Sequence, residues 1–297
     1  MKLTLPWTGE RYIPGIEGNI VLEHTHRYLL AREFVHGKKV LDIASGEGYG
    51  SNFLSEVAES VIGVDIAEDA VNFANQQYKK PGIEFRVGSC STIPLENGSV
   101  DVVVSFETIE HHDEHEAMMA EIKRVLRPNG LLIMSSPDRH EYSDVPGNKN
   151  PFHVKELYQH EFEQLLNAYF AHAKLFGQRV VHGSSISCLS KEVSDYVSYH
   201  GDINEMHKSH GVIRPEYFIA LASDGPLPSV PHSFFTETVD YRQSAGSMMV
   251  QKMDEHNIHQ AELRESLASI YASRSWRLTA PLRKIGEMWR RVRKSLS

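Results

Sequence analysis

The feature that most constrains this chain is an alternation of short apolar runs with helical patterns, which begins at residue 39. Five of the runs are typical of buried strands, at residues 39–43, 60–65, 83–88, 100–105 and 130–135. Helices are expected between them, beginning near Ser51, Ala67 and His115. Strands that are apolar on both faces indicate a parallel sheet covered by helices on both sides. Two further runs, at 173–181 and 216–222, bring the predicted α/β sheet to seven strands.

Changes in composition predict three parts of the chain. Residues 1–38 are expected to form an N-terminal helical cap, and residues 39–235 the sheet domain. An insertion at about 182–214 is longer than an ordinary connection and is a candidate lid or acceptor pocket. Residues 236–297 are expected to form a helical extension. Its near-heptad apolar spacing is compatible with a short coiled coil, through which the chain would form a homo-oligomer, or with a helix packed on the body.

Composition narrows the function classes. The formal net charge of −8 argues against a body that wraps nucleic acid, and two cysteines are too few for a disulfide framework or a CxxC-type zinc site. No stretch is apolar over the width of a bilayer, so we expect a cytoplasmic protein. Basic residues gather in the amphipathic tail at 274–297. That tail can lie peripherally on the inner, anionic face of the cytoplasmic membrane or pack as a solvated helix on an acidic body.

A glycine-rich turn, D-I-A-S-G-E-G-Y-G at residues 42–50, follows the first predicted strand. Glycines in such a turn let the backbone approach a ligand closely. Asp65 ends the second strand, where a carboxylate can accept hydrogen bonds from both ribose hydroxyls of a nucleoside. A dinucleotide site requires G-x-G-x-x-G, whereas Gly46, Gly48 and Gly50 alternate and Ser51 holds the third glycine position. A pyrophosphate-bearing cofactor is therefore disfavoured.

With these motifs, residues 40–137 resemble class I S-adenosylmethionine-dependent methyltransferases. The resemblance implies a Rossmann-like seven-stranded sheet with flanking helices and S-adenosylmethionine as the cofactor. It implies that the glycine-rich loop holds the methionine end, the acid after the second strand holds the ribose, and a polar pair after the third strand contacts the adenine. The corresponding residues are Asp42, Gly46 and Gly48, then Asp65 with Ile66, then Ser89 with Cys90.

Four further residues complete the expected cofactor site. Ala44 stands where the family has its first glycine and leaves slightly less room for the backbone. Arg27 is expected to pair with the methionine carboxylate in a charge-assisted bond, and Tyr12 to close over the pocket. A surface ion pair and a core aromatic are the alternatives for these two. Glu107, after the fourth strand, is expected at the same site.

Acids and imidazoles also follow the fourth predicted strand, in F-E-T-I-E-H-H at residues 106–112. Methyl transfer is an in-line displacement, so the enzyme must align the acceptor and assist its deprotonation. Glu107, Glu110 and His111 would share one face of a helical turn, and His153 can add a fourth ligand for Mg²⁺ or Mn²⁺. Without a metal, His111, His112 or His153 is the expected general base.

This E-x-x-E-H pattern with a distant histidine is similar to the metal-binding pattern of small-RNA 2′-O-methyltransferases. Its first half resembles that of metal-assisted ubiquinone-pathway O-methyltransferases. An E-H pair after the fourth strand also occurs in metal-independent members of the class, where the acid supports the loop. Metal-assisted and metal-independent chemistry therefore both stay open.

Motifs outside the cofactor region bear on the acceptor. T-G-E-R-Y at 8–12, N-P-F-H-V-K-E-L at 150–157 and the tail S-R-S-W-R-L-T-A-P-L-R at 273–283 resemble methyltransferases encoded with bacterial O-antigen and other surface-polysaccharide enzymes. The resemblance implies O-methylation of a sugar hydroxyl on a glycan or nucleotide-sugar acceptor. It also implies a tail that docks on a membrane-associated glycosyltransferase or on the membrane itself.

Three other functions stay open for the chain. It can be a methyltransferase of RNA or one of a small quinone or catechol, and it can be a non-catalytic scaffold in a glycan-assembly complex. The surface around residues 181–214 would distinguish the acceptors. A polar sugar-sized pocket there indicates a sugar, a basic groove indicates RNA, and an apolar slot indicates a quinone or catechol.

Overall fold

The computed structural model describes residues 19–181, 197–201, 206–210, 212 and 214–235. Tyr12, most of the insertion and the whole extension at 236–297 lie outside the described residues, so the predictions made for them stay predictions. Among the described residues, no helix has the length and apolar character needed to cross a membrane.

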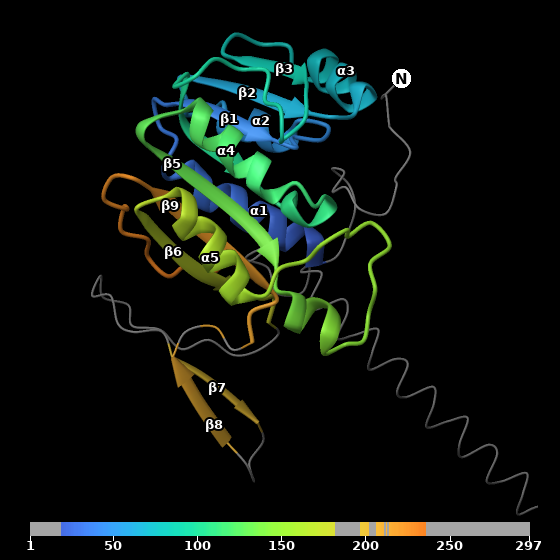
Figure 1. The fold of residues 1–297 in the computed structure, drawn as a ribbon, viewed down its shortest axis with the longest axis vertical. Coiled ribbons are helices and arrows are strands. Elements are labelled where there is room, and N and C mark those ends of the chain that lie inside the picture. The colour runs from blue at the N-terminus through green and yellow to red at the C-terminus, as the bar shows by residue number, and fades with distance from the viewer. Residues whose placement is uncertain (1–18, 182–196, 202–205, 211, 213, 236–297) are drawn as a thin grey trace, which may run out of the picture. The chain divides into compact units, whose positions relative to one another are not determined.

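A seven-stranded mixed sheet forms the centre of the fold (Figure 1). Its strand order is β3-β2-β1-β4-β5-β9-β6. The first five strands pair in parallel, and β9 runs antiparallel between β5 and β6. This sheet confirms the predicted Rossmann-like architecture. The bounds are β1 Lys39–Ile43, β2 Ser60–Asp65, β3 Ile83–Val87, β4 Val100–Ser105, β5 Leu126–Pro137, β6 His172–Gln178 and β9 Tyr217–Ser223.

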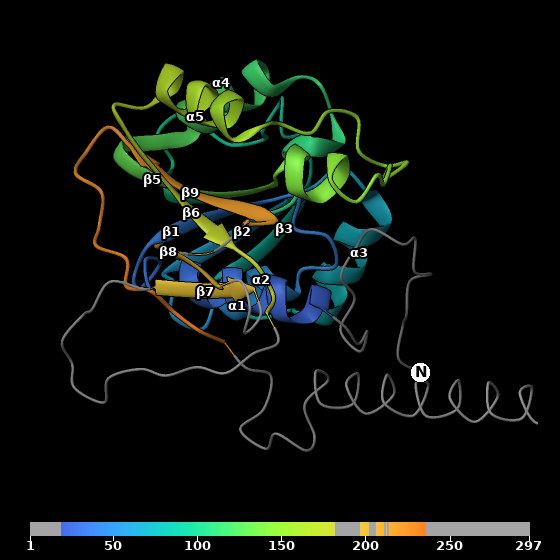
Figure 2. The same cartoon turned by 90° about the horizontal axis from the view of Figure 1, so that it is seen from below.

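Helices cover both faces of the sheet (Figure 2). One face carries α1 Asn19–Arg32, α2 Tyr49–Leu54 and α3 Glu68–Gln77, and the other carries α4 His115–Val125 and α5 Gln159–Tyr169. Successive residues of β5 serve opposite faces because side chains alternate along a strand. Leu132 and Met134 join the hydrophobic cluster that includes Met118 of α4, whereas Ile133 joins the cluster that includes Tyr28 of α1. The continuous apolar runs in the sequence thus reflect burial on two sides.

Short irregular elements follow the carboxyl ends of the central strands. A 3₁₀ turn, Ile109–His111, comes after β4, and a π-helix, Arg139–Asp144, comes after β5. The insertion contains a separate two-stranded hairpin of β7 Val197–Gly201 and β8 Met206–His210. Because parallel strands end at the same edge of a sheet, this edge brings together loops that are far apart in the sequence.

The structure departs from the prediction in three places. Strand β5 begins at Leu126 rather than at 130, because residues 127–130 form a bulge within the strand, where the register against β4 shifts and Asn129 has a φ of 61°. Helix α5 and the π-helix were not expected. The β7–β8 hairpin was also missed, because its strands V-S-Y-H-G and M-H-K-S-H carry few apolar residues.

The backbone at Ala44 generates a stability prediction. This exposed alanine has a φ of 59°, a left-handed conformation that costs an L-residue about 1 kcal/mol. We expect Ala44→Gly to raise the free energy of unfolding, measured by urea denaturation, by about 0.5–1 kcal/mol. The matched control is Ala70→Gly in α3, at a fully buried helical position, which should lower the same quantity by about 1 kcal/mol or more. Equal losses in both variants would contradict the interpretation of strain at Ala44.

Candidate functional site

The glycine-rich loop after β1 leaves open space at one glycine and none at another. Gly46 and Gly48 both have left-handed φ angles, of 53° and 82°. A Cβ added at Gly48 would lie 2.5 Å from the ring of Phe85, so internal packing requires that glycine. A Cβ added at Gly46 would meet no atom within 4 Å. The backbone at Gly46 therefore faces a space that a bound cofactor can enter.

Asp65 is fixed at the end of β2 by the loop it faces. One carboxylate oxygen accepts a hydrogen bond from the Gly46 amide at 2.8 Å, and the other accepts from the Ala67 amide at 2.9 Å. Each oxygen keeps further acceptor capacity for ribose hydroxyls. Ile66 follows with 76% of its surface exposed, so its apolar side chain is open to contact with a ligand. The pair suits a nucleoside whose sugar and base lie against this edge.

Asp42 is buried beneath the same loop and is held by two helices. Ser51 of α2 donates to its carboxylate at 2.6 Å, and Tyr28 of α1 donates to it at 3.3 Å. Burial raises the pKa of Asp42 to about 7, although both hydroxyl bonds oppose the rise. Asp42 thus ties the cofactor loop to the helices on one face of the sheet.

The adenine-contacting pair expected after β3 lies next to one of the candidate bases. Ser89 Oγ lies 3.0 Å from Ser91 Oγ, and Cys90 Sγ lies 3.3 Å from His112 Nε2. His112 Nε2 also lies 3.3 Å from the sulfur of Met118, and burial lowers the pKa of this histidine. The structure therefore places His112 with Cys90 and apart from His111 and His153.

Arg27 has the largest side chain among those that are almost completely buried. Its Nε donates to Gln178 at 2.7 Å, its Nη1 lies 3.4 Å from Glu107, and its guanidinium lies 4.4 Å from the centre of the Tyr217 ring. Within the described residues, neither Nη1 nor Nη2 has a hydrogen-bond partner. A buried guanidinium with unmet donors fits the carboxylate of an amino-acid-bearing cofactor.

Glu107 belongs to the Arg27 group rather than to the 3₁₀ turn. Its φ of 51° turns the chain before the turn begins at Ile109. Ser135 Oγ donates to the Glu107 carboxylate at 2.6 Å. The expectation that Glu107, Glu110 and His111 share one helical face is therefore wrong for Glu107, while its role as a ligand stays a prediction.

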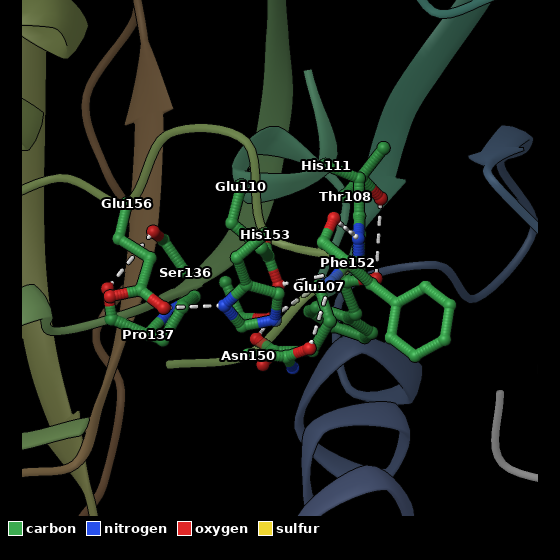
Figure 3. Close-up of polar contacts among 12 residues, drawn as sticks. Glu107, Thr108, Glu110, His111, Ser136, Pro137, Asn150, Phe152, His153 and Glu156 are labelled. Carbon is green, nitrogen blue, oxygen red and sulfur yellow. Dashed lines mark hydrogen bonds and ion pairs between the residues drawn. The ribbon is translucent and has the colours of Figure 1, made fainter. Parts of the chain in front are cut away.

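Glu110, His111 and His153 form a compact group of side chains, each of which can offer one ligand atom to a metal ion (Figure 3). One ligand atom of each lies within 4.8 Å of the others. Glu110 is 1% exposed, and neither of its carboxylate oxygens has a hydrogen-bond partner in the described part of the chain. Burial, followed by the nearby charge of Glu107, raises the pKa of Glu110 well above its usual range. This carboxylate is therefore costly to keep ionised without a cation beside it.

Backbone contacts fix this group across two loops. The carbonyl of Glu110 accepts hydrogen bonds from the amides of Val154 at 2.8 Å and Lys155 at 3.1 Å. The Phe152 carbonyl lies 3.1 Å from His111 Nδ1, and Glu156 lies 2.5 Å from His153 Nδ1. Partners on the Nδ1 atoms orient both rings, as they do for metal-binding and for general-base histidines. Glu156, three residues after His153, was missed in the sequence although the H-x-x-E spacing is visible there.

A pocket of about 630 Å³ opens beside this group. Tyr142 lines it and stacks on His153 at 5.2 Å, while Tyr217 lines it and lies under Arg27. The pocket therefore adjoins both the group of Glu110, His111 and His153 and the group around Arg27. Most of its lining is polar, and two of the lining residues, Asn150 and Pro151, belong to the motif at 150–157. The lining residues are Asn19, Glu23, Glu141, Tyr142, Val145, Pro146, Asn148, Lys149, Asn150, Pro151, Arg179, Arg214, Glu216 and Tyr217.

Part of the chain is similar to known methyltransferases. Residues 41–134 match the family model described as "Methyltransferase domain". A "Probable S-adenosylmethionine-dependent methyltransferase" of Mycolicibacterium smegmatis is 39% identical over 168 residues, which are 54% of this chain and 63% of that protein. A relative of the same description from Mycobacterium tuberculosis is 39% identical over 54% of this chain and 60% of its own length. This chain thus spans about three-fifths of these curated relatives.

Two further matches are more distant. The "Phthiotriol/phenolphthiotriol dimycocerosates methyltransferase" of Mycobacterium leprae is 31% identical over 116 residues, which are 38% of this chain and 40% of that protein. Among solved structures, the YcgJ protein of Bacillus subtilis has a TM-score of 0.49 and 14% identity, over 67% of this chain and 98% of its own.

Glu23 gives this site a testable pH dependence. It lines the pocket, is 7% exposed, and has its pKa raised from 4.5 to about 7, chiefly by burial. The folded state therefore binds a proton that the unfolded chain releases between these values, so the free energy of unfolding falls as the pH rises through this window. We expect Glu23→Gln to raise the melting temperature at pH 8 and to leave it nearly unchanged near pH 4.5.

The control for Glu23→Gln is Glu33→Gln, which removes one negative charge from an exposed position just beyond α1. Melting curves from pH 4.5 to 8 would show a difference in the free energy of unfolding between wild type and Glu23→Gln. This difference widens with pH and is of the order of 1–3 kcal/mol at pH 8. Parallel pH profiles for wild type and both variants would refute the buried-acid assignment.

Proposed function

We propose, from the premise that residues 41–134 are an S-adenosylmethionine-dependent methyltransferase domain, that this chain is an O-methyltransferase whose acceptor is a sugar hydroxyl. The acceptor belongs to a bacterial surface glycan or to its nucleotide-sugar precursor. A divalent cation, Mg²⁺ or Mn²⁺, assists the reaction. The observation that carries the proposal is the buried Glu110 carboxylate, which lies without a hydrogen-bond partner among the described residues beside two oriented imidazoles.

The chain offers a recognition group for each part of the cofactor. The open space at Gly46 admits it, Asp65 accepts from the ribose hydroxyls, and Arg27 pairs with the methionine carboxylate. Ser89 and Cys90 would contact the adenine, and the exposed side chain of Ile66 would offer the base an apolar surface. The names of the relatives, two of which state S-adenosylmethionine dependence, support the same cofactor.

Glu110, His111 and His153 would hold the metal, with Glu107 as a further ligand from the Arg27 side. A bound divalent cation supplies positive charge that lowers the pKa of an acceptor hydroxyl. The chain itself fixes the directions of the ligands: the Phe152 carbonyl orients His111, and the Glu156 carboxylate orients His153. Arg27, whose Nη1 lies 3.4 Å from Glu107, helps to hold that carboxylate in place.

Metal-independent chemistry remains the alternative at the same residues. His153, with Glu156 at 2.5 Å from its Nδ1, has the arrangement of a general base backed by a carboxylate. His111 is the second candidate and is oriented by a neutral carbonyl. His112 packs against sulfur atoms and is the least favoured of the three candidate bases.

The pocket supports a sugar over the other acceptors. Its asparagines, carboxylates and tyrosines provide hydrogen-bond acceptors and donors for several hydroxyls, with two aromatic rings in the lining. An apolar slot for a quinone or catechol would lack these groups. A groove for RNA would be more basic and would not place Glu23, Glu141 and Glu216 against the ligand. The tail at 274–297, outside the described residues, is proposed to bring the enzyme to the membrane or to a glycosyltransferase.

The proposal is tested by calorimetric titration of chelator-treated protein with S-adenosylmethionine and, separately, with Mg²⁺ or Mn²⁺. We expect wild type to bind both, and Glu110→Gln to keep the cofactor affinity within about threefold while losing at least about tenfold in metal affinity. The control is Glu114→Gln, an exposed acid close to the turn in sequence, which should change neither affinity. Cofactor binding without metal binding would leave His153 as the base, and absence of cofactor binding would contradict the methyltransferase and favour the scaffold.

A further inference from the structure

Cations that the proposed chemistry does not use gather along the pocket. Arg179 follows β6, Arg214 precedes β9, and Lys149 lies in the loop after the π-helix. Segments distant in the sequence therefore each bring one positive charge to the lining of the same cavity.

Glu141 of the π-helix organises the two arginines. Arg214 Nε donates to both of its carboxylate oxygens, at 2.9 and 3.1 Å. Arg179 Nη1 lies 3.7 Å from the same carboxylate and donates to the Arg214 carbonyl. Arg214 has a φ of 47°, so its backbone is held in a left-handed conformation that a non-glycine residue rarely adopts. The two guanidiniums are thus fixed side by side on one acid.

Exposure separates the interior of the pocket from its mouth. Glu23 and Tyr217 are 7% and 8% exposed, whereas the side chains of Arg179 and Arg214 are 34% and 55% exposed and Lys149 is exposed. The interior therefore presents carboxyl and phenol groups, and the cations form the mouth. We call Arg179, Arg214 and Lys149 the basic mouth.

The arginines of the basic mouth have N–H donors that their internal contacts do not use. Within the described residues, Arg214 donates to Glu141 only through its Nε, and Arg179 donates to the Arg214 carbonyl only through its Nη1. The remaining guanidinium N–H groups can donate to a ligand. The lining carries three cations and three acids, and burial raises the pKa of one of these acids, Glu23, to about 7, which reduces its negative charge near neutral pH. Two guanidiniums side by side match the geometry of phosphate oxygens.

We propose that the basic mouth binds a phosphate group of the acceptor, so that the sugar extends inward from it toward Tyr217, Glu23 and His153. The direction of the sugar rests on the proposed function, whereas phosphate binding itself does not. The recognised chemistry is a phosphate ester, which occurs both in soluble sugar phosphates and in lipid phosphates.

The experiment measures phosphate recognition by the full chain in two arms. In solution, calorimetry compares glucose 1-phosphate with glucose, and at a membrane, sedimentation compares phosphatidylcholine vesicles with and without phosphatidic acid. We expect at least about a tenfold preference for the phosphate-bearing probe in one arm, lost to within about twofold in the Arg179→Gln/Arg214→Gln double variant. The arm that shows the preference names the source of the phosphate.

Two single variants separate phosphate binding from a structural role of the arginines. Arg139→Gln is the matched control, because Arg139 lies on the same π-helix and pairs with Asp144 but does not line the pocket. Glu141→Gln releases both guanidiniums from their internal acid, so we expect it to tighten binding of the phosphate probe by about threefold or more. A role confined to holding the π-helix predicts weaker binding in that variant instead.

Equal affinity of wild type and the double variant for the phosphate-bearing probes in both arms would overturn the proposal, as would the absence of any phosphate preference in wild type. Titration of each variant with S-adenosylmethionine tests the proposed function separately. Intact cofactor binding with no phosphate preference would contradict only the proposal of phosphate binding at the basic mouth. Phosphate binding without cofactor binding would contradict only the proposal of methyltransferase function.

Discussion

The arrangement of the site depends on the burial of Arg27. A guanidinium that is 1% exposed is costly to bury unless each neighbouring element supplies an acceptor or a π face. Gln178 from the end of β6, Glu107 from the end of β4 and Tyr217 from the start of β9 meet part of that requirement, and Nη1 and Nη2 keep no hydrogen-bond partner among the described residues. Helix α1 is thereby fixed to three strands at one edge of the sheet. One of these contacts also reaches the pocket, because Tyr217 lines the pocket and lies under Arg27.

Three of the four non-glycine residues that have positive φ angles among the described residues lie where ligands are expected, and the fourth, Asn129, lies in the bulge of β5. Ala44, Glu107 and Arg214 all have positive φ angles although none is glycine, and they lie in the cofactor loop, beside Arg27 and at the basic mouth. A left-handed residue persists only where surrounding contacts hold it, and here those contacts are the Ser135 bond to Glu107 and the Glu141 bonds to Arg214. Contacts within the folded chain thus stabilise loop conformations that these residues would not favour on their own.

The sheet could be predicted from the sequence because its signals are local. Continuous apolar runs marked the strands, and the turn at 42–50 marked the cofactor loop without any knowledge of the fold. Glu110, His111 and His153 could be named from residue type and spacing. Glu23, Gln178 and Arg214 could not, because each is polar, lies in an unremarkable sequence and gains its role only when β6 and β9 close against α1. The π-helix that carries Glu141 has no local pattern that distinguishes it from a loop.

The two ends of the acceptor pocket follow from one electrostatic constraint. Burial raises the pKa values of Glu23 and Glu110, and the charge of Glu107 adds to the rise at both. Arg27 can compensate one of these three acids by direct contact, and it lies closest to Glu107. Within the described residues, Arg27 forms no ion pair with Glu110 or Glu23. Glu110 therefore favours a positive charge beside it, and Glu23 favours hydrogen-bond donors such as sugar hydroxyls. An anionic group on the acceptor would be repelled by this interior, so it must stay at the mouth, where Arg179, Arg214 and Lys149 offer the charge that the interior lacks.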